Sequence, residues 1–160
     1  MEKRLSEIED PILNNHHFKF YDMPLYGITS HRKISLENRK KLANLFTDAH
    51  CSIMIAPEQF VHVIFSEGIP LIGNNGLYIH ANVRKGRNTS QIENLCQTLT
   101  EGCAEILQIS EDKIHINLME IEAKWCMEGG YIMPDPGEED EWMEKVTNAL
   151  KERESEMVEA

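Results

Sequence analysis

The sequence contains no long hydrophobic run, and this absence excludes a membrane-spanning protein. Among its 160 residues, no apolar stretch approaches the ~20 residues that a transmembrane helix requires. The acidic amino terminus, MEKRLSEIED, also differs from a signal or transit peptide. With 41% hydrophobic and 27% charged residues, the composition is that of an ordinary globular protein. We therefore expect a cytoplasmic protein with one core of domain size and no membrane partner.

Cysteine and positive charge are also scarce. The 4 cysteines show no C-x-x-C spacing, which predicts reduced thiols rather than a disulfide framework or a zinc site. The 16 basic residues stand against 27 acidic ones, and the net charge of −11 argues against nucleic acid as a partner. Most of this excess, −7, falls in residues 134–160. We expect an acidic carboxy-terminal helix and tail over residues 138–160.

An internal repeat organises the middle of the chain. Residues 39–67 align without a gap to residues 92–120 at an offset of 53 positions, with 6 identities in 29 positions. The same offset carries residues 25–30 onto residues 78–83. Hydrophobic class and turn positions also agree along the alignment. We interpret the two segments as copies of one structural unit.

Each unit is predicted to fold as strand, helix, strand, because apolar residues recur at helical spacing between two strand-like stretches. Ser90 with Glu93 predicts a capping box at the start of the second helix, and Pro57 closes the first. The predicted fold class is α/β (α+β), with two fused β-α-β units forming a four-stranded sheet, two helices on one face and a C-terminal helix. Residues 1–23 are an amino-terminal extension, and residues 24–137 the doubled domain.

The second strand of the first unit, Phe60–Phe65, is apolar on both faces. Two helices can cover only one face of a sheet, so we expect another subunit on the other. His62 and His115, which the repeat relates, are expected on neighbouring strands as a core or interface pair. Without a third ligand they do not predict a metal site.

Two features are candidates for an anion site. The turn Arg84-Lys85-Gly86-Arg87 lies between a predicted strand and a helix start, where main-chain N–H groups and guanidinium groups can converge on a carboxylate or phosphate. A solvated turn is the alternative reading. His50 lies at the edge of the apolar stripe of the first helix, where a packed or surface histidine is the alternative.

The order of several short motifs resembles a known family. Around the doubled unit they are Met23-Pro24-Leu25-Tyr26, Thr47-Asp48-Ala49-His50, Arg84-x-x-Arg87, and Met127-Glu128-x-Gly130-x-x-x-Pro134-x-Pro136-Gly137 followed by Trp142. In this order and spacing they resemble the cis-chloroacrylic acid dehalogenase subgroup of the tautomerase superfamily, over about residues 23–145.

The resemblance implies a homotrimer of doubled β-α-β protomers that acts on a small carboxylic acid without a cofactor or metal. In that family an amino-terminal proline is the catalytic group, two arginines and a histidine hold the substrate carboxylate, and a glutamate with a tyrosine activates water. By position, the implied catalytic residues are Pro24 and Glu128, and the implied substrate-binding residues are His50, Arg84, Arg87 and Asn117.

Two positions depart from the family pattern. Asn117 stands where the family has a tyrosine, and an amide does not titrate like a phenol, which weakens the case for hydration or dehalogenation. Pro24 follows 23 other residues, so its nitrogen is a tertiary amide without a basic lone pair. Either a chain beginning at Met23 exposes Pro24, or the protein uses the fold without the proline, which then serves only to begin a strand.

Two functions therefore follow from the sequence. The first is a cofactor-free tautomerase that acts on a small 2-oxo or enol carboxylic acid by proton transfer, with water addition only if Glu128 works without the tyrosine. The alternative is a catalytically silent family member that binds a small carboxylate or a protein partner.

Overall fold

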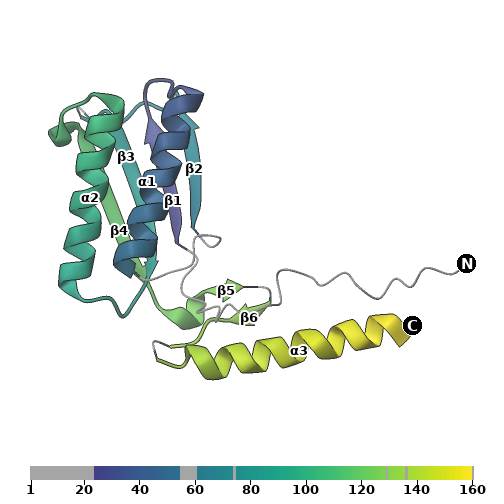
Figure 1. Cartoon of the computed structure of the whole chain (residues 1–160). Helices are drawn as coiled ribbons and strands as arrows, with labels where there is room; N and C mark the ends of the chain where they lie inside the picture. The colour runs from purple at the N-terminus through teal and green to yellow at the C-terminus, as the bar shows by residue number, and fades with distance from the viewer. Residues whose placement is uncertain (1–23, 55–60, 74, 129, 136, 160) are drawn as a thin grey trace, which may run out of the picture.

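The computed structural model describes residues 24–54, 61–73, 75–128, 130–135 and 137–159. Four strands form one sheet in the order β2-β1-β3-β4. They are β1 (Leu25–Ser30), β2 (His62–Glu67), β3 (Leu77–Arg84) and β4 (Ile114–Ile121). Two helices, α1 (Leu36–Met54) and α2 (Thr89–Leu107), lie side by side on one face of this sheet (Figure 1).

Smaller elements follow the second unit. The 3-10 turn η2 (Glu111–Lys113) leads into β4, and η3 (Ala123–Trp125) leads into a hairpin of β5 (Met127–Glu128) and β6 (Tyr131–Ile132). The last helix, α3 (Glu139–Glu159), lies beside this hairpin at one end of the sheet (Figure 1). The predicted fold class is confirmed. None of the helices in the described residues combines the length and apolar character needed to cross a membrane.

The repeat is visible in the structure. Both ends of α1 and α2 differ by the offset found in the sequence. The parallel registers repeat as well, since Leu25 pairs with His62 in the first unit and Tyr78 pairs with His115 in the second. The antiparallel contact of β1 with β3 joins the units and pairs Gly27 with its own repeat equivalent, His80. The two units are therefore related by a local twofold axis that passes between these two residues.

The expected helix boundaries need two corrections. The capping box of α2 is formed by Asn88 and Gln91, not by Ser90 and Glu93: the Asn88 side chain accepts from the Gln91 N–H at 2.9 Å, and the Gln91 side chain accepts from the Asn88 N–H at 3.1 Å. The reason is that asparagine caps as well as serine does, and the helix begins at Thr89. The first helix ends at Met54, and Pro57 lies outside the described residues.

The two repeat-related histidines are not neighbours. His62 is on β2 and His115 is on β4, the two edges of the sheet, so the expected pair was wrong. In each unit the second strand pairs in parallel with the first, on the side away from the other unit, so β2 and β4 are edge strands. His115 instead stacks on Tyr78 of β3, with ring centroids 5.2 Å apart. The four cysteines all lie in the described residues, and none of them forms a disulfide.

The core lies between the sheet and the two helices. Alternate residues of the central strands β1 and β3 are buried against them, whereas the opposite face of the sheet carries partly exposed side chains. On that open face Leu25, Ile64 and Met119 are 38%, 55% and 48% exposed. The helices thus cover one face only, as expected from the number of helices.

Leu42 and Leu95 test whether the two units contribute equally to this core. They are repeat equivalents on α1 and α2, and both are fully buried. We expect Leu42→Ala and Leu95→Ala each to lower the free energy of unfolding by about 2–5 kcal/mol. Urea denaturation measures this, with Leu36→Ala as the control because Leu36 is 64% exposed. A loss confined to one of the two variants would contradict equal roles.

Candidate functional site

His50 is a polar residue of the core. It lies on α1, is completely buried and packs behind the start of β1. Its Nδ1 lies 2.6 Å from the phenol oxygen of Tyr26, and the two rings meet edge to face. Phe46, one helical turn earlier, packs edge to face on the same phenol. His50 Nε2 is buried and has no hydrogen-bond partner in the described part of the chain.

The ionisation of His50 follows from this position. Burial first, and the nearby positive charge of Arg87 second, lower the pKa of His50 from 6.5 to about 4. The ring is therefore neutral at pH 7. When the Tyr26 hydroxyl donates to Nδ1, the single ring proton lies on Nε2. A neutral N–H donor is then available to an anionic oxygen.

The two arginines of the turn after β3 contribute differently. Arg84, the last residue of β3, is buried, and its Nη1 donates to the main-chain carbonyl of Pro134 at 3.1 Å. This bond ties the segment that follows β6 to the end of the sheet. Arg87 is half-buried, and its charge reaches His50. Arg84 and Arg87 are thus held against the protein, whereas Lys85 and Gly86 between them are exposed, and Lys85 pairs with Glu122.

The charge of Arg87 can be tested through His50. In Arg87→Gln we expect the pKa of His50 to rise above about 4 and to stay below 6.5, because burial, the larger cause, remains. An NMR titration of the His50 ring measures it. Lys85→Gln, which removes an exposed charge from the same turn, should leave that pKa unchanged. An equal shift in both variants would mean that Arg87 has no particular role.

Solved structures share the fold of this chain. The crystal structure of N1, a member of the cis-3-chloroacrylic acid dehalogenase (cis-CaaD) family, superposes with a TM-score of 0.68 and 30% identity over 82% of this chain and 99% of that one. This chain belongs to the cis-CaaD family. It is thereby a member of the tautomerase superfamily, as the sequence predicted.

More distant structures share the fold of this cis-CaaD family member. A fused 4-OT, solved as an asymmetric trimer, has a TM-score of 0.62 and 22% identity over 68% of this chain and 94% of that one. Leishmania major MIF2 has a TM-score of 0.61 and 15% identity over 69% of this chain and 97% of that one. No protein-family model and no curated protein sequence matches the chain.

The positions implied by the cis-CaaD resemblance do not all lie together within one protomer. Pro24 is fully buried, precedes β1 and accepts from the His62 N–H at 3.0 Å. It lies two residues before Tyr26, and hence on the same side of the strand as Tyr26 and His50. Asn117 instead lies on the open face, where its Nδ2 is 3.2 Å from Nδ1 of His80. Glu128 pairs through its backbone with Tyr131 in the hairpin.

Two contributors to the site were missed in the sequence. Tyr26 was noted only as part of a strand motif, although its hydroxyl orients His50. Tyr26 and Ile28 are both buried on one face of β1, and their i, i+2 spacing is the signal in the sequence that could have found Tyr26. The carbonyl of Pro134 was missed because a main-chain acceptor has no sequence signature. In the described residues, no group of three or more His, Cys, Asp or Glu side chains is arranged to hold a metal ion.

Proposed function

We propose that this cis-CaaD family member binds a small 2-oxo or enol carboxylic acid beside His50 and Arg87, and tautomerises it by proton transfer when Pro24 is the first residue. The observation that carries the proposal is His50 Nε2, a buried ring nitrogen with no partner in the described residues. A buried donor without an acceptor is costly, and a carboxylate oxygen would satisfy it.

Charge and proton transfer complete the mechanism. The guanidinium of Arg87 pairs with the substrate carboxylate and stabilises the negative charge that develops on the enolate. Tyr26 keeps His50 in the tautomer that donates from Nε2. His50 itself is a weak base, because its pKa of about 4 leaves little driving force for proton abstraction at pH 7. The remaining candidate base is the secondary amine of an amino-terminal Pro24, a residue that is buried at the start of β1.

A second candidate function is carboxylate binding without turnover. It is favoured by the full-length sequence, in which the Pro24 nitrogen is an amide and cannot accept a proton. Two measurements separate the functions: calorimetry with pyruvate detects binding, and spectrophotometry with phenylenolpyruvate detects turnover. Binding without turnover by a chain that begins at Pro24 would favour the silent binder, and absence of both would overturn both functions.

We also propose a homotrimer assembled through the open face of the sheet. Leu25, Ile64 and Met119 come from three strands and are exposed on that face, which no helix of the described residues covers. A fused 4-OT of the same fold forms an asymmetric trimer. Light scattering should give three times 18.4 kDa. Ile64→Glu should lower this mass, whereas Leu36→Glu, on a helix at the other face, should not. A monodisperse monomer at micromolar concentration would contradict the proposal.

A further inference from the structure

A cavity of about 500 Å³ lies at the end of the sheet opposite Pro24. Pro24 precedes the first residue of β1, whereas Ser30, its last residue, lines this cavity. The other walls come from the turn into α1, the connector between the two units, and η2. The Gly76 N–H donates to the Lys113 carbonyl at 2.8 Å and holds the connector against η2. Its volume is typical of a small-molecule site.

The cavity is lined by positive charge. Arg32, Lys33 and Lys113 line it together with His31, and no aspartate or glutamate is among the described residues that do. Glu111 and Asp112 precede Lys113 in the chain but do not line the cavity. A hollow lined by charge of one sign concentrates its field and attracts counter-ions.

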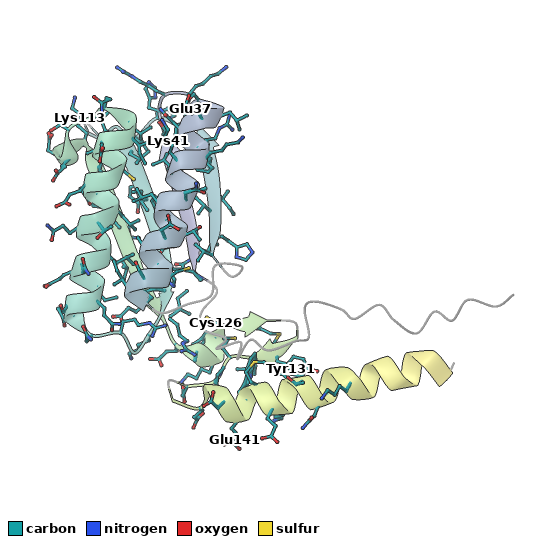
Figure 2. The ribbon with its side chains drawn as sticks, in the orientation of Figure 1. Glu37, Lys41, Lys113, Cys126, Tyr131 and Glu141 are labelled. Atoms are coloured by element: carbon teal, nitrogen blue, oxygen red, sulfur yellow. The ribbon has the colours of Figure 1, made fainter. Side chains whose placement is uncertain are left out.

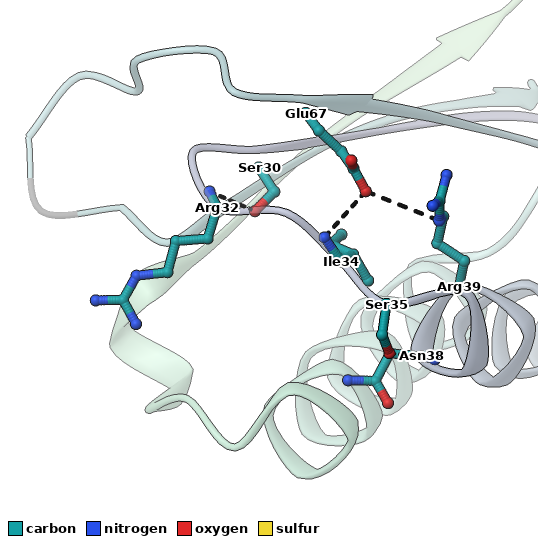
Figure 3. Close-up of polar contacts among 7 residues, drawn as sticks. All are labelled: Ser30, Arg32, Ile34, Ser35, Asn38, Arg39 and Glu67. Carbon is teal, nitrogen blue, oxygen red and sulfur yellow. Dashed lines mark hydrogen bonds and ion pairs between the residues drawn. The ribbon is translucent and has the colours of Figure 1, made fainter.

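The carboxylate of Glu67 does not neutralise this charge. Glu67 accepts from the Ile34 N–H at 3.0 Å and lies 3.8 Å from Nε of Arg39. Figure 3 shows the Arg32 side chain extending away from Glu67. Lys113 is at the same end of the molecule, remote from Cys126 and Tyr131 of the hairpin region (Figure 2). Among the described residues, no salt bridge engages Arg32, Lys33 or Lys113.

Part of the wall is apolar. Ile34 is buried, and Leu71, Leu107 and Ile109 are half-buried where they line the cavity. An inorganic ion would use only the basic side chains. A ligand with an apolar body would also remove this hydrocarbon surface from water, which is favourable in proportion to the area covered.

The repeat relates this cavity to the Pro24 site. The local twofold axis exchanges the two ends of the sheet, so the turn His31–Ile34 occupies the position of Arg84–Arg87. Positive side chains are thus present at both ends. The proton-transfer groups are not, because Leu77 stands in place of Pro24 and Cys103 in place of His50. The second end therefore carries positive side chains that can bind an anion, but it lacks the groups that could transfer a proton.

We infer that this cavity is a second ligand site, which binds a small organic anion with an apolar body and does not transform it. The probe for the test is phenyl phosphate, which joins a dianion to an aromatic ring, and inorganic phosphate is the comparison without the ring. Titration of the full-length, ¹⁵N-labelled chain should shift the amide signals of Gly76 and Lys113 saturably. Phenyl phosphate should bind several-fold more tightly than inorganic phosphate.

The variant Arg32→Gln/Lys113→Met removes two charges and keeps most of the side-chain length. It should weaken phenyl phosphate binding at Gly76 at least tenfold, since each charge-assisted hydrogen bond supplies a large part of the affinity for a small anion. The control Lys124→Gln/Lys145→Gln removes the same charge from η3 and α3, which do not line the cavity, and should change affinity less than twofold.

Three results would overturn this site. One is a set of shifts confined to the turn 84–87, which would place the probe only at the first site. Another is unchanged affinity in Arg32→Gln/Lys113→Met. The third is an equal loss in both double variants, which would mean that only net charge matters. Because Arg32 is exposed and Lys113 keeps its apolar stem as methionine, the variant should fold, and circular dichroism checks this.

Discussion

A chain that begins at Met23 and loses that methionine should ketonise phenylenolpyruvate at least tenfold faster than the full-length chain. When Pro24 becomes the first residue, its nitrogen is a secondary amine instead of an amide. Pro24 is fully buried. We expect burial and the positive charges of Arg84 and Arg87 to disfavour the protonated form of that amine and to leave it able to accept a proton at neutral pH. A tenfold gain is about 1.4 kcal/mol in the barrier, a modest demand on a general base. His50 adds no charge to this field, because its pKa of about 4 keeps it neutral.

The control for this result is Pro24→Ala in both lengths of chain. The shortened chain should lose most of its gain, because alanine lacks the rigid pyrrolidine ring that fixes the position of the secondary amine in the site. The full-length chain should hardly change, since either residue is an amide there. Intact mass verifies that Met23 has been removed. Equal activity of the two lengths, with both indifferent to the substitution, would take Pro24 out of the mechanism.

Replacing both Arg84 and Arg87 with alanine should weaken binding of a small 2-oxo acid by two or more orders of magnitude. Each charge-assisted contact is typically worth ~1.5–3 kcal/mol, and two such contacts multiply in the binding constant. Calorimetry with pyruvate measures the loss. Unchanged affinity would show that these arginines do not hold the ligand.

The two arginines need separate variants, because Arg84 also donates to Pro134. Arg84→Ala should destabilise the fold as well as reduce binding, since it leaves the carbonyl of the buried Pro134 without this donor. Arg87→Ala should reduce binding with little effect on urea denaturation, because Arg87 is only half-buried. Lys85→Ala controls for the loss of one charge from the turn. A single Arg87→Ala variant that binds like the parent would assign the whole effect to Arg84.

The fold was predictable because the repeat aligns each helix and strand of one unit with its equivalent in the other. One ungapped offset fixed both helices and both parallel strand pairs, and a β-α-β crossover fixes which faces meet. The strand order was less accessible. Placing His62 and His115 as neighbours ignored that the two units meet through β1 and β3, which leaves β2 and β4 at the edges. The contact between the two units depends on side-chain packing between distant segments, and the hydrophobic periodicity within one segment does not indicate it.

The candidate site was predictable only in part. Arg84, Arg87 and His50 were found from their places at element ends and from the family resemblance, and the structure places them at one end of the sheet. The neutrality of His50 could not be predicted, since it depends on complete burial and on the approach of Arg87. Whether Asn117 or Glu128 acts on a substrate remains a prediction, and Asn117 lies on the other face of the sheet from His50.

The pairing of Gly27 with His80 has a consequence for how such a protein can diverge. In an assembly of two identical units, the side chain at this position would face its own copy across the axis. A single chain removes that constraint, and the two positions now hold the smallest residue and an imidazole ring, whose Cβ lies 3.8 Å from where a Gly27 Cβ would stand. Covalent fusion thus lets the two units mutate independently, so that the two ends of the sheet can acquire different side chains, as Pro24 and His50 at one end and Leu77 and Cys103 at the other illustrate.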